Sequence, residues 1–290
     1  MLKILKNLSP YKWVVVGVIA LVFGQSMAEL FLPTLMADII DNGVVQGNIP
    51  YIWRIGGWML LVSAVGAAAA IFASYYSAKA AMGLGRDLRQ KVFKHVGQFS
   101  LQEFDEVGTA SLITRTTNDI TQVQQVVIMM LRMVISAPIM LVGGLILAIS
   151  KDAQLSLVIV GAMPILAVSI LLILKYGMPL FQQVQKQLDG LNLVVRENLT
   201  GIRVIRAFNR ETEEKARMQK ANRELADVSI KVNKVMAFLM PVMMLVMNMT
   251  VVAVIWFGGI RINNGAMQIG DLMAFIQYVM MIMFALVMAS

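Results

Sequence analysis

The sequence has no cysteine, and His95 is its only histidine. Disulfide bonds and thiol chemistry are therefore excluded, as is a zinc site built from the usual His and Cys ligands. Charge is also scarce, because Asp, Glu, Lys and Arg make up 14% of the 290 residues, against about 25% in an average soluble domain. Hydrophobic residues make up 58%. This balance indicates that much of the chain lies in lipid.

Signatures of catalysis are missing as well. The dipeptide Gly-Lys does not occur, so the chain lacks the Gly-x4-Gly-Lys-[Ser/Thr] loop that cradles nucleotide phosphates. No nucleophile stands in a recognisable pattern with a base, and no carboxylate pair has a catalytic spacing. We therefore predict no catalytic residue, no metal site and no cofactor bound by this chain, which is not an enzyme by itself.

Six apolar segments are each long enough to cross a bilayer, which takes about 20 residues of helix. Strands of a membrane barrel need only about 10 residues, so these segments favour helices. The sequence predicts an all-α integral membrane protein with six transmembrane helices. The predicted spans are residues 13–32, 55–76, 123–149, 155–174, 235–259 and 272–289.

The basic residues are unevenly distributed. The net charge is +8, and twelve of the 25 Lys and Arg residues lie between Lys175 and Lys234, with six more between Lys79 and Arg115. Positive charge beside membrane helices marks the cytoplasmic side. We therefore predict a multi-pass protein with a cytoplasmic N-terminus and two long cytoplasmic loops. No stacking aromatics are interleaved with these charges, which argues against nucleic-acid binding.

The two long loops, residues 77–122 and 175–234, have the periodicity of helices. Apolar residues recur about every fourth position in both, which disordered loops would not maintain. Gly108 and Gly201 interrupt the pattern. Phe104 precedes the first interruption, and Phe208 follows the second. A helical arm of about 25 residues reaches roughly 37 Å. The loops are therefore predicted to be helical hairpins that project into the cytoplasm.

Two motifs resemble the intracellular loops of ABC exporters. Residues 104–119 contain an aromatic residue, a glycine and then Leu-x-x-Arg-x-x-x-Asp. Residues 197–211 read Glu-Asn-Leu-Thr-Gly-Ile-Arg-Val-Ile-Arg-Ala-Phe-Asn-Arg-Glu, which is the more specific match. The layout of six spans agrees, so the whole chain resembles the type-1 transmembrane domain of bacterial multidrug exporters that work as heterodimers.

The resemblance implies that each arm ends in a short coupling helix, at about residues 100–107 and 206–213. These helices would dock on nucleotide-binding domains, one in cis and one in trans. ATP and Mg²⁺ would bind to those domains, outside this chain. The residues implied in coupling are Phe104, Asp105, Arg206, Phe208, Asn209 and Glu211.

The resemblance also implies a second six-helix half. Because the similar exporters are heterodimers, this half is expected to be a non-identical partner. The domain covers residues 1–290 and stops within the sixth predicted helix. We therefore expect a portion of a longer half-transporter that resides in the plasma membrane, as in a bacterial cytoplasmic membrane.

Polar and ionisable groups inside spans are costly and mark transport pathways. Methionines form stripes beside several of them, and methionine suits surfaces that accept varied ligands. Packing between helices is the alternative role of the same residues. Prolines near the spans, Pro33 and Pro138 among them, would allow kinks. The predicted substrate cavity comprises Gln25, Glu29, Arg132, Met133, Met247, Asn248, Gln277 and Met281.

The leading hypothesis is the transmembrane half of an ATP-driven exporter that moves amphipathic, lipophilic small molecules out of the cytoplasm by alternating access. An exporter of lipids or peptides is a close alternative. A secondary transporter or channel would show broken helices, inverted repeats or an ion-binding ring. A membrane scaffold whose arms bind a soluble partner is more remote.

Overall fold

The computed structural model describes residues 6–289, which are helical apart from short turns. No strand occurs among these residues, and six helical stretches are long and apolar enough to cross a membrane. The predicted all-α fold with six transmembrane helices is thereby confirmed. The elements are η1 (Lys6–Tyr11), α2 (Lys12–Asp38), η2 (Ile39–Val44), α3 (Ile49–Val96), α4 (Leu101–Val107), α5 (Thr109–Thr114), η3 (Arg115–Asp119), α6 (Ile120–Met129), η4 (Met130–Val134), α7 (Ile135–Lys151), α8 (Ser156–Ala207), α9 (Glu211–Ala237), α10 (Leu239–Asn263) and α11 (Ile269–Ala289).

The membrane-spanning helices continue well beyond their apolar segments. Helix α3 has 48 residues and is therefore about 72 Å long at 1.5 Å per residue. Its only proline stands in the first turn, where the missing N–H is tolerated. Helix α8 has 52 residues. Span and arm are thus one continuous helix in each case. Helix α3 has no proline after its first turn, which makes its arm a stiff extension of the membrane segment, whereas α8 contains Pro164 and Pro179.

The chain forms two compact units, one of Met1–Ile159 with Val251–Ser290 and one of Val160–Thr250. In the first unit α2 packs against α3, α7 and α11, and α3 packs against α6. The core under α2 and α3 contains the small residues Ala73, Ala80 and Ala81, each almost fully buried. Small side chains let the backbones of neighbouring membrane helices approach closely.

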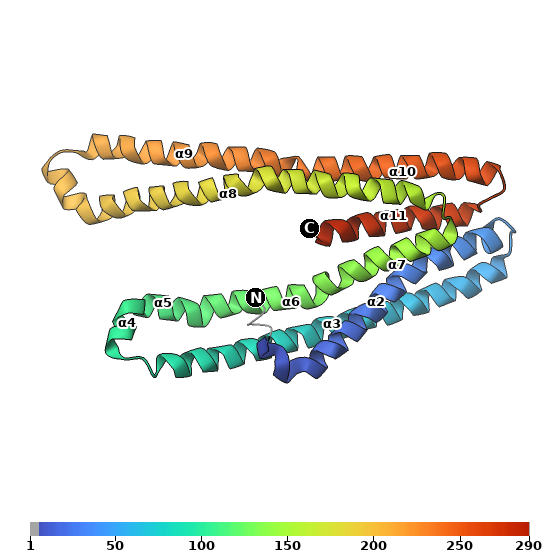
Figure 1. Ribbon diagram of the computed structural model, residues 1–290, viewed down its shortest axis with the longest axis horizontal. Coiled ribbons are helices and arrows are strands. Elements are labelled where there is room, and N and C mark those ends of the chain that lie inside the picture. The colour runs from blue at the N-terminus through green and yellow to red at the C-terminus, as the bar shows by residue number, and fades with distance from the viewer. Residues whose placement is uncertain (1–5, 290) are drawn as a thin grey trace. The chain divides into compact units, whose positions relative to one another are not determined.

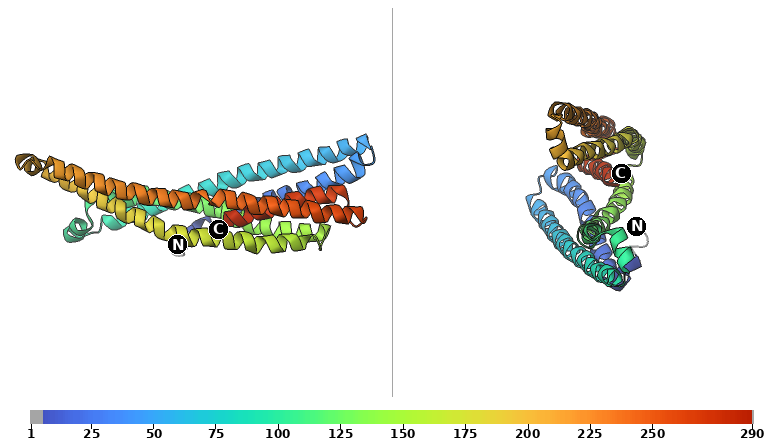
Figure 2. Two further views of the ribbon diagram at one scale, coloured as in Figure 1. Left: turned by 90° about the horizontal axis from the view of Figure 1, so that it is seen from above. Right: turned by 90° about the vertical axis from the view of Figure 1, so that its left-hand side faces the viewer.

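In the second unit α8 and α9 lie side by side and antiparallel (Figure 1, Figure 2). Arg217 of α9 forms an ion pair with Glu197 of α8 at 2.6 Å, and Asn198 donates a hydrogen bond to Glu214 at 2.9 Å. Met236 packs against the backbone of α8 at Gly177, where a side chain would collide with it. The predicted hairpin is therefore held by polar ties near its tip and by close packing near its base.

The first hairpin ends in a short helix, close to its predicted place. Helix α4 begins after Ser100, whose hydroxyl accepts the N–H of Glu103 at 3.3 Å, while the Glu103 carboxylate accepts the N–H of Ser100 at 2.8 Å. This reciprocal capping box satisfies two backbone donors at the helix start. Gly108 follows with φ 78°, a conformation that glycine adopts without steric cost. The turn at Gly108 agrees with the sequence.

The second hairpin differs from the prediction. Gly201 does not interrupt the helix, because α8 continues through it to Ala207, and one glycine costs a helix only about 1 kcal/mol. Residues 206–213 do not form a separate helix either, since the chain turns at Phe208–Arg210 and α9 begins at Glu211. Asn209 makes this turn with φ 54°, and asparagine is the usual substitute for glycine there.

Candidate functional site

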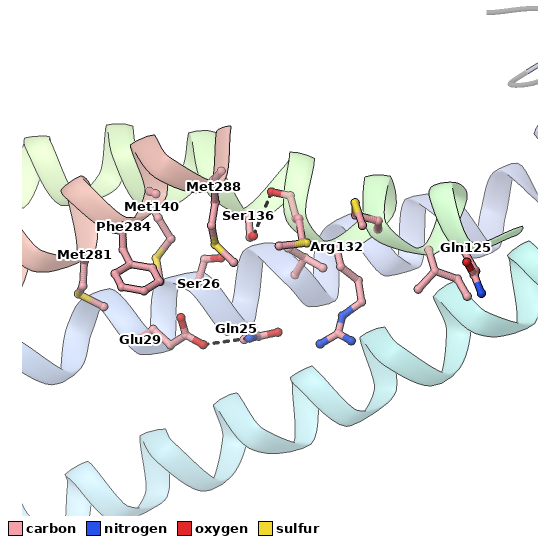
Figure 3. Close-up of a pocket in the computed structure, with 16 residues that line it drawn as sticks. Gln25, Ser26, Glu29, Gln125, Arg132, Ser136, Met140, Met281, Phe284 and Met288 are labelled. Carbon is pink, nitrogen blue, oxygen red and sulfur yellow. Dashed lines mark hydrogen bonds between the residues drawn. The ribbon is translucent and has the colours of Figure 1, made fainter. Parts of the chain in front are cut away.

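A cavity of 790 Å³ lies within the first unit, among α2, the α6–η4–α7 segment and α11 (Figure 3). Its wall is mainly apolar, with a small number of polar and charged groups. The lining residues are Val22, Gln25, Ser26, Glu29, Gln125, Ile128, Met129, Arg132, Met133, Ser136, Ala137, Met140, Met281, Phe284, Ala285 and Met288.

The backbone around this cavity is interrupted on two sides. Helix α2 contains Pro33, which has no N–H to donate to the carbonyl of Glu29 one turn earlier. Helix α7 contains Pro138, and the π-helical turn η4, Met130–Val134, precedes α7. Single π-turns occur often at functional sites. Local breaks in helical hydrogen bonding therefore adjoin both Glu29 and Arg132.

The two charged groups of the cavity are not paired with each other. Gln25 donates from Nε2 to Glu29 Oε1 at 2.9 Å, as expected for residues one turn apart on a helix. Arg132 donates from Nη1 to the Ser74 hydroxyl at 3.4 Å. Of the ion pairs among residues 6–289, none includes Glu29 or Arg132. Both charges remain available to a third group.

Sulfur and aromatic side chains form much of the apolar wall. Met129, Met133 and Met140 come from the α6–α7 segment, and Met281 and Met288 come from α11 beside Phe284. The thioether of methionine is flexible and polarisable and adapts to ligands of different shape. The wall can therefore accept an apolar body without demanding one particular outline.

The structure brings together five of the eight residues predicted to line a cavity: Gln25, Glu29, Arg132, Met133 and Met281. Gln277 lies one helical turn before Met281 on α11, is exposed and does not line this cavity. Met247 and Asn248 belong to the second unit, so their predicted role stays a prediction. Ser26 and Ser136 were missed, because serine inside a span carries no strong sequence signal.

The spacing of Met236, Met240, Met243 and Met247 in the fifth span predicts one stripe on a continuous helix, but the backbone interrupts that helix. Helix α9 ends at Ala237 and α10 begins at Leu239, because Pro241 has no N–H for the carbonyl of Ala237. Met236 therefore belongs to α9, where it packs on α8. Met243 is buried in its own unit and Met240 is exposed. These methionines do not share one continuous helical face.

The tips of the arms expose apolar side chains. Phe208 is 74% exposed at the second tip. At the first tip Phe104 is half-buried, whereas Leu101 on the same short helix is 81% exposed. Asp105, Asn209 and Glu211 are exposed beside them. Sequence reasoning selected the aromatic residue and missed Leu101, the first residue of α4.

Polar side chains at the second tip are partly engaged within the arm. Arg206 faces Glu211 at 3.8 Å and is 72% exposed, so this pair contributes little to stability. An apolar groove of 550 Å³ lies between α8 and α9 behind the tip, lined by Leu199, Ile202 and Met218 among others. The tip is therefore a mixed surface with an apolar centre and a charged rim.

Comparison with known proteins agrees with this architecture. Residues 15–286 match the family described as ABC transporter transmembrane region. The chain is 39% identical, over 98% of its length, to an uncharacterized ABC transporter ATP-binding protein of Mycobacterium tuberculosis, of which it covers 49%. It is 35% identical, over 96% of its length, to an uncharacterized ABC transporter ATP-binding protein of Bacillus subtilis, of which it covers 48%.

A more distant relative of Rickettsia typhi, 25% identical over 95% of this chain, carries the words export ATP-binding/permease in its name. The chain covers 48% of that protein as well. It thus spans about half the length of the curated relatives it matches. The family match covers nearly all of the chain, and the six long helices with two helical hairpins supply the architecture, so this chain belongs to the family of ABC transporter transmembrane regions.

Proposed function

We propose that this chain is the transmembrane half of an ATP-driven exporter that moves amphipathic, lipophilic molecules out of the cytoplasm by alternating access. The observation that carries the proposal is the cavity among α2, α7 and α11, where an adaptable apolar wall surrounds two charges that are not paired. Unpaired charge at membrane depth is expensive. A water-filled pathway or a bound polar ligand removes that cost.

The arms support an ATP-driven mechanism. Rigid helices transmit displacement. Helix α3 runs from membrane segment to arm with no proline after its first turn, and α8 is one helix over the same kind of path, although it contains Pro164 and Pro179. The proposed contacts with nucleotide-binding domains are made by Phe104, Asp105, Arg206, Phe208, Asn209 and Glu211. We include Leu101 among them, because it is exposed on the same short helix as Phe104. An apolar centre with a polar rim is the usual composition of such contacts. ATP and Mg²⁺ would bind on those domains.

The working unit would contain a second six-helix half, because one half supplies only part of the wall of a central cavity. We propose a non-identical partner. If the full-length protein that contains this chain is expressed without any partner and purifies as an active exporter, the proposal of a non-identical partner is contradicted. Failure of engineered cysteines to crosslink two halves would contradict the dimer itself.

The main test is ATP hydrolysis and transport by the chain reconstituted with its nucleotide-binding domains and partner. We expect an amphipathic substrate to stimulate hydrolysis and to accumulate inside inverted vesicles only when ATP is present. Accumulation driven by an ion gradient without ATP would favour a secondary transporter. Hydrolysis that no amphiphile, lipid or peptide changes, with no transport, would favour a scaffold.

Export of lipids or peptides stays the closest alternative within the same mechanism. The relatives' names refer to ATP binding and export and do not specify a substrate. Competition between an amphipathic dye and either a phospholipid or a peptide in the same vesicles separates the possibilities. The compound that excludes the others at the lowest concentration identifies the substrate class.

A further inference from the structure

The charges of the cavity carry information about the ligand. Glu29 is half-buried on α2, and Arg132 is exposed on the π-turn η4. Figure 3 shows Gln25 lying between them along the cavity. Gln25 and Ser74 each offer these charges a neutral hydrogen-bond partner. A neutral partner does not cancel a charge, so each group still favours an opposite charge, and burial strengthens that attraction more at Glu29 than at Arg132.

A ligand with a single charge would satisfy only half of this site. A lipophilic cation gains the attraction of Glu29 and meets the repulsion of Arg132. An anion has the reverse problem. A neutral ligand that displaced water would leave both protein charges without solvation, which is costly. A ligand that carries both signs can offer a partner to each protein charge and leaves no net charge in the cavity.

We propose that the cavity recognises zwitterionic amphiphiles, with the anionic group at Arg132, the cationic group at Glu29 and the apolar chain against the methionine wall. This inference rests on the proposed function and narrows its substrate class. Arg132 suits the anionic group, because guanidinium presents several N–H donors in a plane that matches carboxylate or phosphate oxygens. The Glu29 carboxylate accepts from ammonium groups or attracts a quaternary ammonium by charge alone.

Each end of the site adjoins an irregularity of the backbone. Pro33, one turn after Glu29 on α2, cannot donate to the carbonyl of that residue. On the opposite wall the π-turn η4 carries Arg132 and Met133, which both line the same cavity. The two ends of the site are therefore built on separate helices.

The experiment measures equilibrium binding of matched probes to the purified chain in nanodiscs, each probe below its micelle concentration. Four probes share a dodecyl chain: dodecylphosphocholine, dodecyltrimethylammonium, dodecyl phosphate and dodecyl maltoside. We expect the zwitterion to bind most tightly. Glu29→Gln should weaken binding of the zwitterion and of the cation by about tenfold each, as for loss of one charged contact, and should tighten binding of the anion. Arg132→Gln should weaken binding of the zwitterion and of the anion, and should tighten binding of the cation.

Matched controls lie outside the cavity. Arg54→Gln and Glu106→Gln remove one exposed charge of each sign and should leave the order of the four probes unchanged. If each cavity substitution weakens all four probes equally, the residues act on the fold, and the proposal is wrong. If the cation binds more tightly than the zwitterion to the unsubstituted chain, the proposal is wrong as well.

Two further probes separate the sources of such a ligand. Dodecyl betaine replaces phosphate by carboxylate, and diheptanoyl phosphatidylcholine carries two chains on the same headgroup. Tighter binding of the two-chain probe would point to a membrane phospholipid, and tighter binding of the betaine to a single-chain solute. Failure of the proposed function is distinguishable, because it appears as absent ATP-dependent transport while the charge-swap pattern in binding persists.

Discussion

Asn209 shows how one residue sets the geometry of an arm. Its N–H bonds to the carbonyl of Arg206 at 3.2 Å, and the N–H of Arg210 bonds to the carbonyl of Ile205 at 2.9 Å. With Asn209 in the left-handed conformation, these bonds are those of a Schellman motif, which closes the end of a helix. The residue implied in docking therefore also forms the turn that presents Phe208.

Substitution of Asn209 separates the two roles. Asn209→Val should destabilise the turn by about 1–2 kcal/mol, because a side chain branched at Cβ is strained in the left-handed region. Asn209→Gly should leave the turn intact, since glycine adopts that conformation freely. Hydrogen exchange at the Arg210 amide measures the turn. A glycine variant that exchanges as fast as the valine variant would contradict this account.

The capping role of Glu103 determines the direction in which its pKa is shifted. Two hydrogen bonds from Ser100, one from the N–H and one from the hydroxyl at 2.9 Å, stabilise the ionised carboxylate and lower the pKa of Glu103 below its ordinary value of 4.5. A lowered pKa in the folded state means that the cap stabilises α4 above the unfolded pKa. The stabilisation is lost as pH falls through the folded pKa.

Carbon-13 NMR of labelled glutamate tests this pH dependence. The carboxyl of Glu103 should titrate below 4.5, and Ser100→Ala should raise its midpoint by removing the hydroxyl donor. The exposed Glu106 of the same helix serves as a reference within each sample. A Glu103 midpoint that is unchanged in the Ser100 variant would show that the hydroxyl does not hold the carboxylate.

At the scale of elements, the helices that line the cavity are interrupted, whereas the first arm begins as a continuous helix. The helices around the cavity are broken by Pro33, by Pro138 and by the π-turn η4, and such points absorb changes in helix direction at low cost. Helix α3 has no proline after its first turn, whereas α8 contains Pro164 and Pro179. Within the first unit, movement is thus favoured beside the cavity, and stiffness is favoured along α3 to its arm.

A pair of phenylalanine substitutions tests the tip of the second arm. Phe208→Ala in the complete transporter should abolish stimulation of ATP hydrolysis by substrate, because a buried aromatic anchor at an interface contributes about 2 kcal/mol or more. The matched control is Phe93→Ala, since Phe93 is 77% exposed on the first arm but lies before its tip. Neither substitution should change thermal unfolding of the chain.

The control decides how the result is interpreted. Equal loss of stimulation in both variants would indicate that exposed phenylalanines matter for arm stability or solubility. Normal stimulation and transport in the Phe208 variant would contradict its role in coupling. A parallel Leu101→Ala variant extends the test to the first tip, where leucine is more exposed than Phe104.

At the scale of the whole molecule, polar contacts join helix ends within the first unit, on the side opposite the tip of the first arm (Figure 1). Lys151 pairs with Asp271 at 2.7 Å, and Asp41 accepts the N–H of Gly270 at 2.7 Å. Arg261 pairs with Asp152, which also accepts the N–H of Leu155 at the start of α8. These ties connect α7, α10, α11 and η2, so separation of the helices at this end requires several of them to break.

Cysteine labelling tests the proposed orientation, and the absence of native cysteine removes any background. Single cysteines at the exposed positions Gln46, Ala153 and Asn264 should react with a membrane-impermeant maleimide added outside intact cells. Cysteines at Gln98 and Lys220 on the arms should react only after the membrane is permeabilised. The positions lie in turns or on exposed helix faces, so the fold should tolerate each change.

Labelling of the arm positions in intact cells would place the arms outside and overturn the proposed topology. Asp152, in the α7–α8 connection, is unsuitable for this test, because it is buried and its side chain accepts the N–H of Leu155. Ala153 next to it is exposed and serves the same purpose.

The sequence by itself determined the membrane fold, the number of spans and the two hairpins. These properties depend on the length of apolar runs and on helical periodicity, which are local. Gln25 and Glu29 share one helix face for the same local reason, because a spacing of four residues places side chains together wherever the helix lies. Gly108 was predictable for a similar reason, since a left-handed turn selects glycine.

Only the tertiary structure decided which faces meet. Gln277 and Met281 share a face of α11, yet the cavity reaches Met281 alone, because its extent depends on where α2 and α7 approach α11. Tyr278 fixes that approach through hydrogen bonds to Thr34 at 2.6 Å and to the carbonyl of Leu30 at 3.1 Å. The π-turn at Arg132 and the turn at Asn209 were likewise invisible in sequence. Each is a departure from regular helix that competing hydrogen bonds and packing select, and local propensity does not encode that competition.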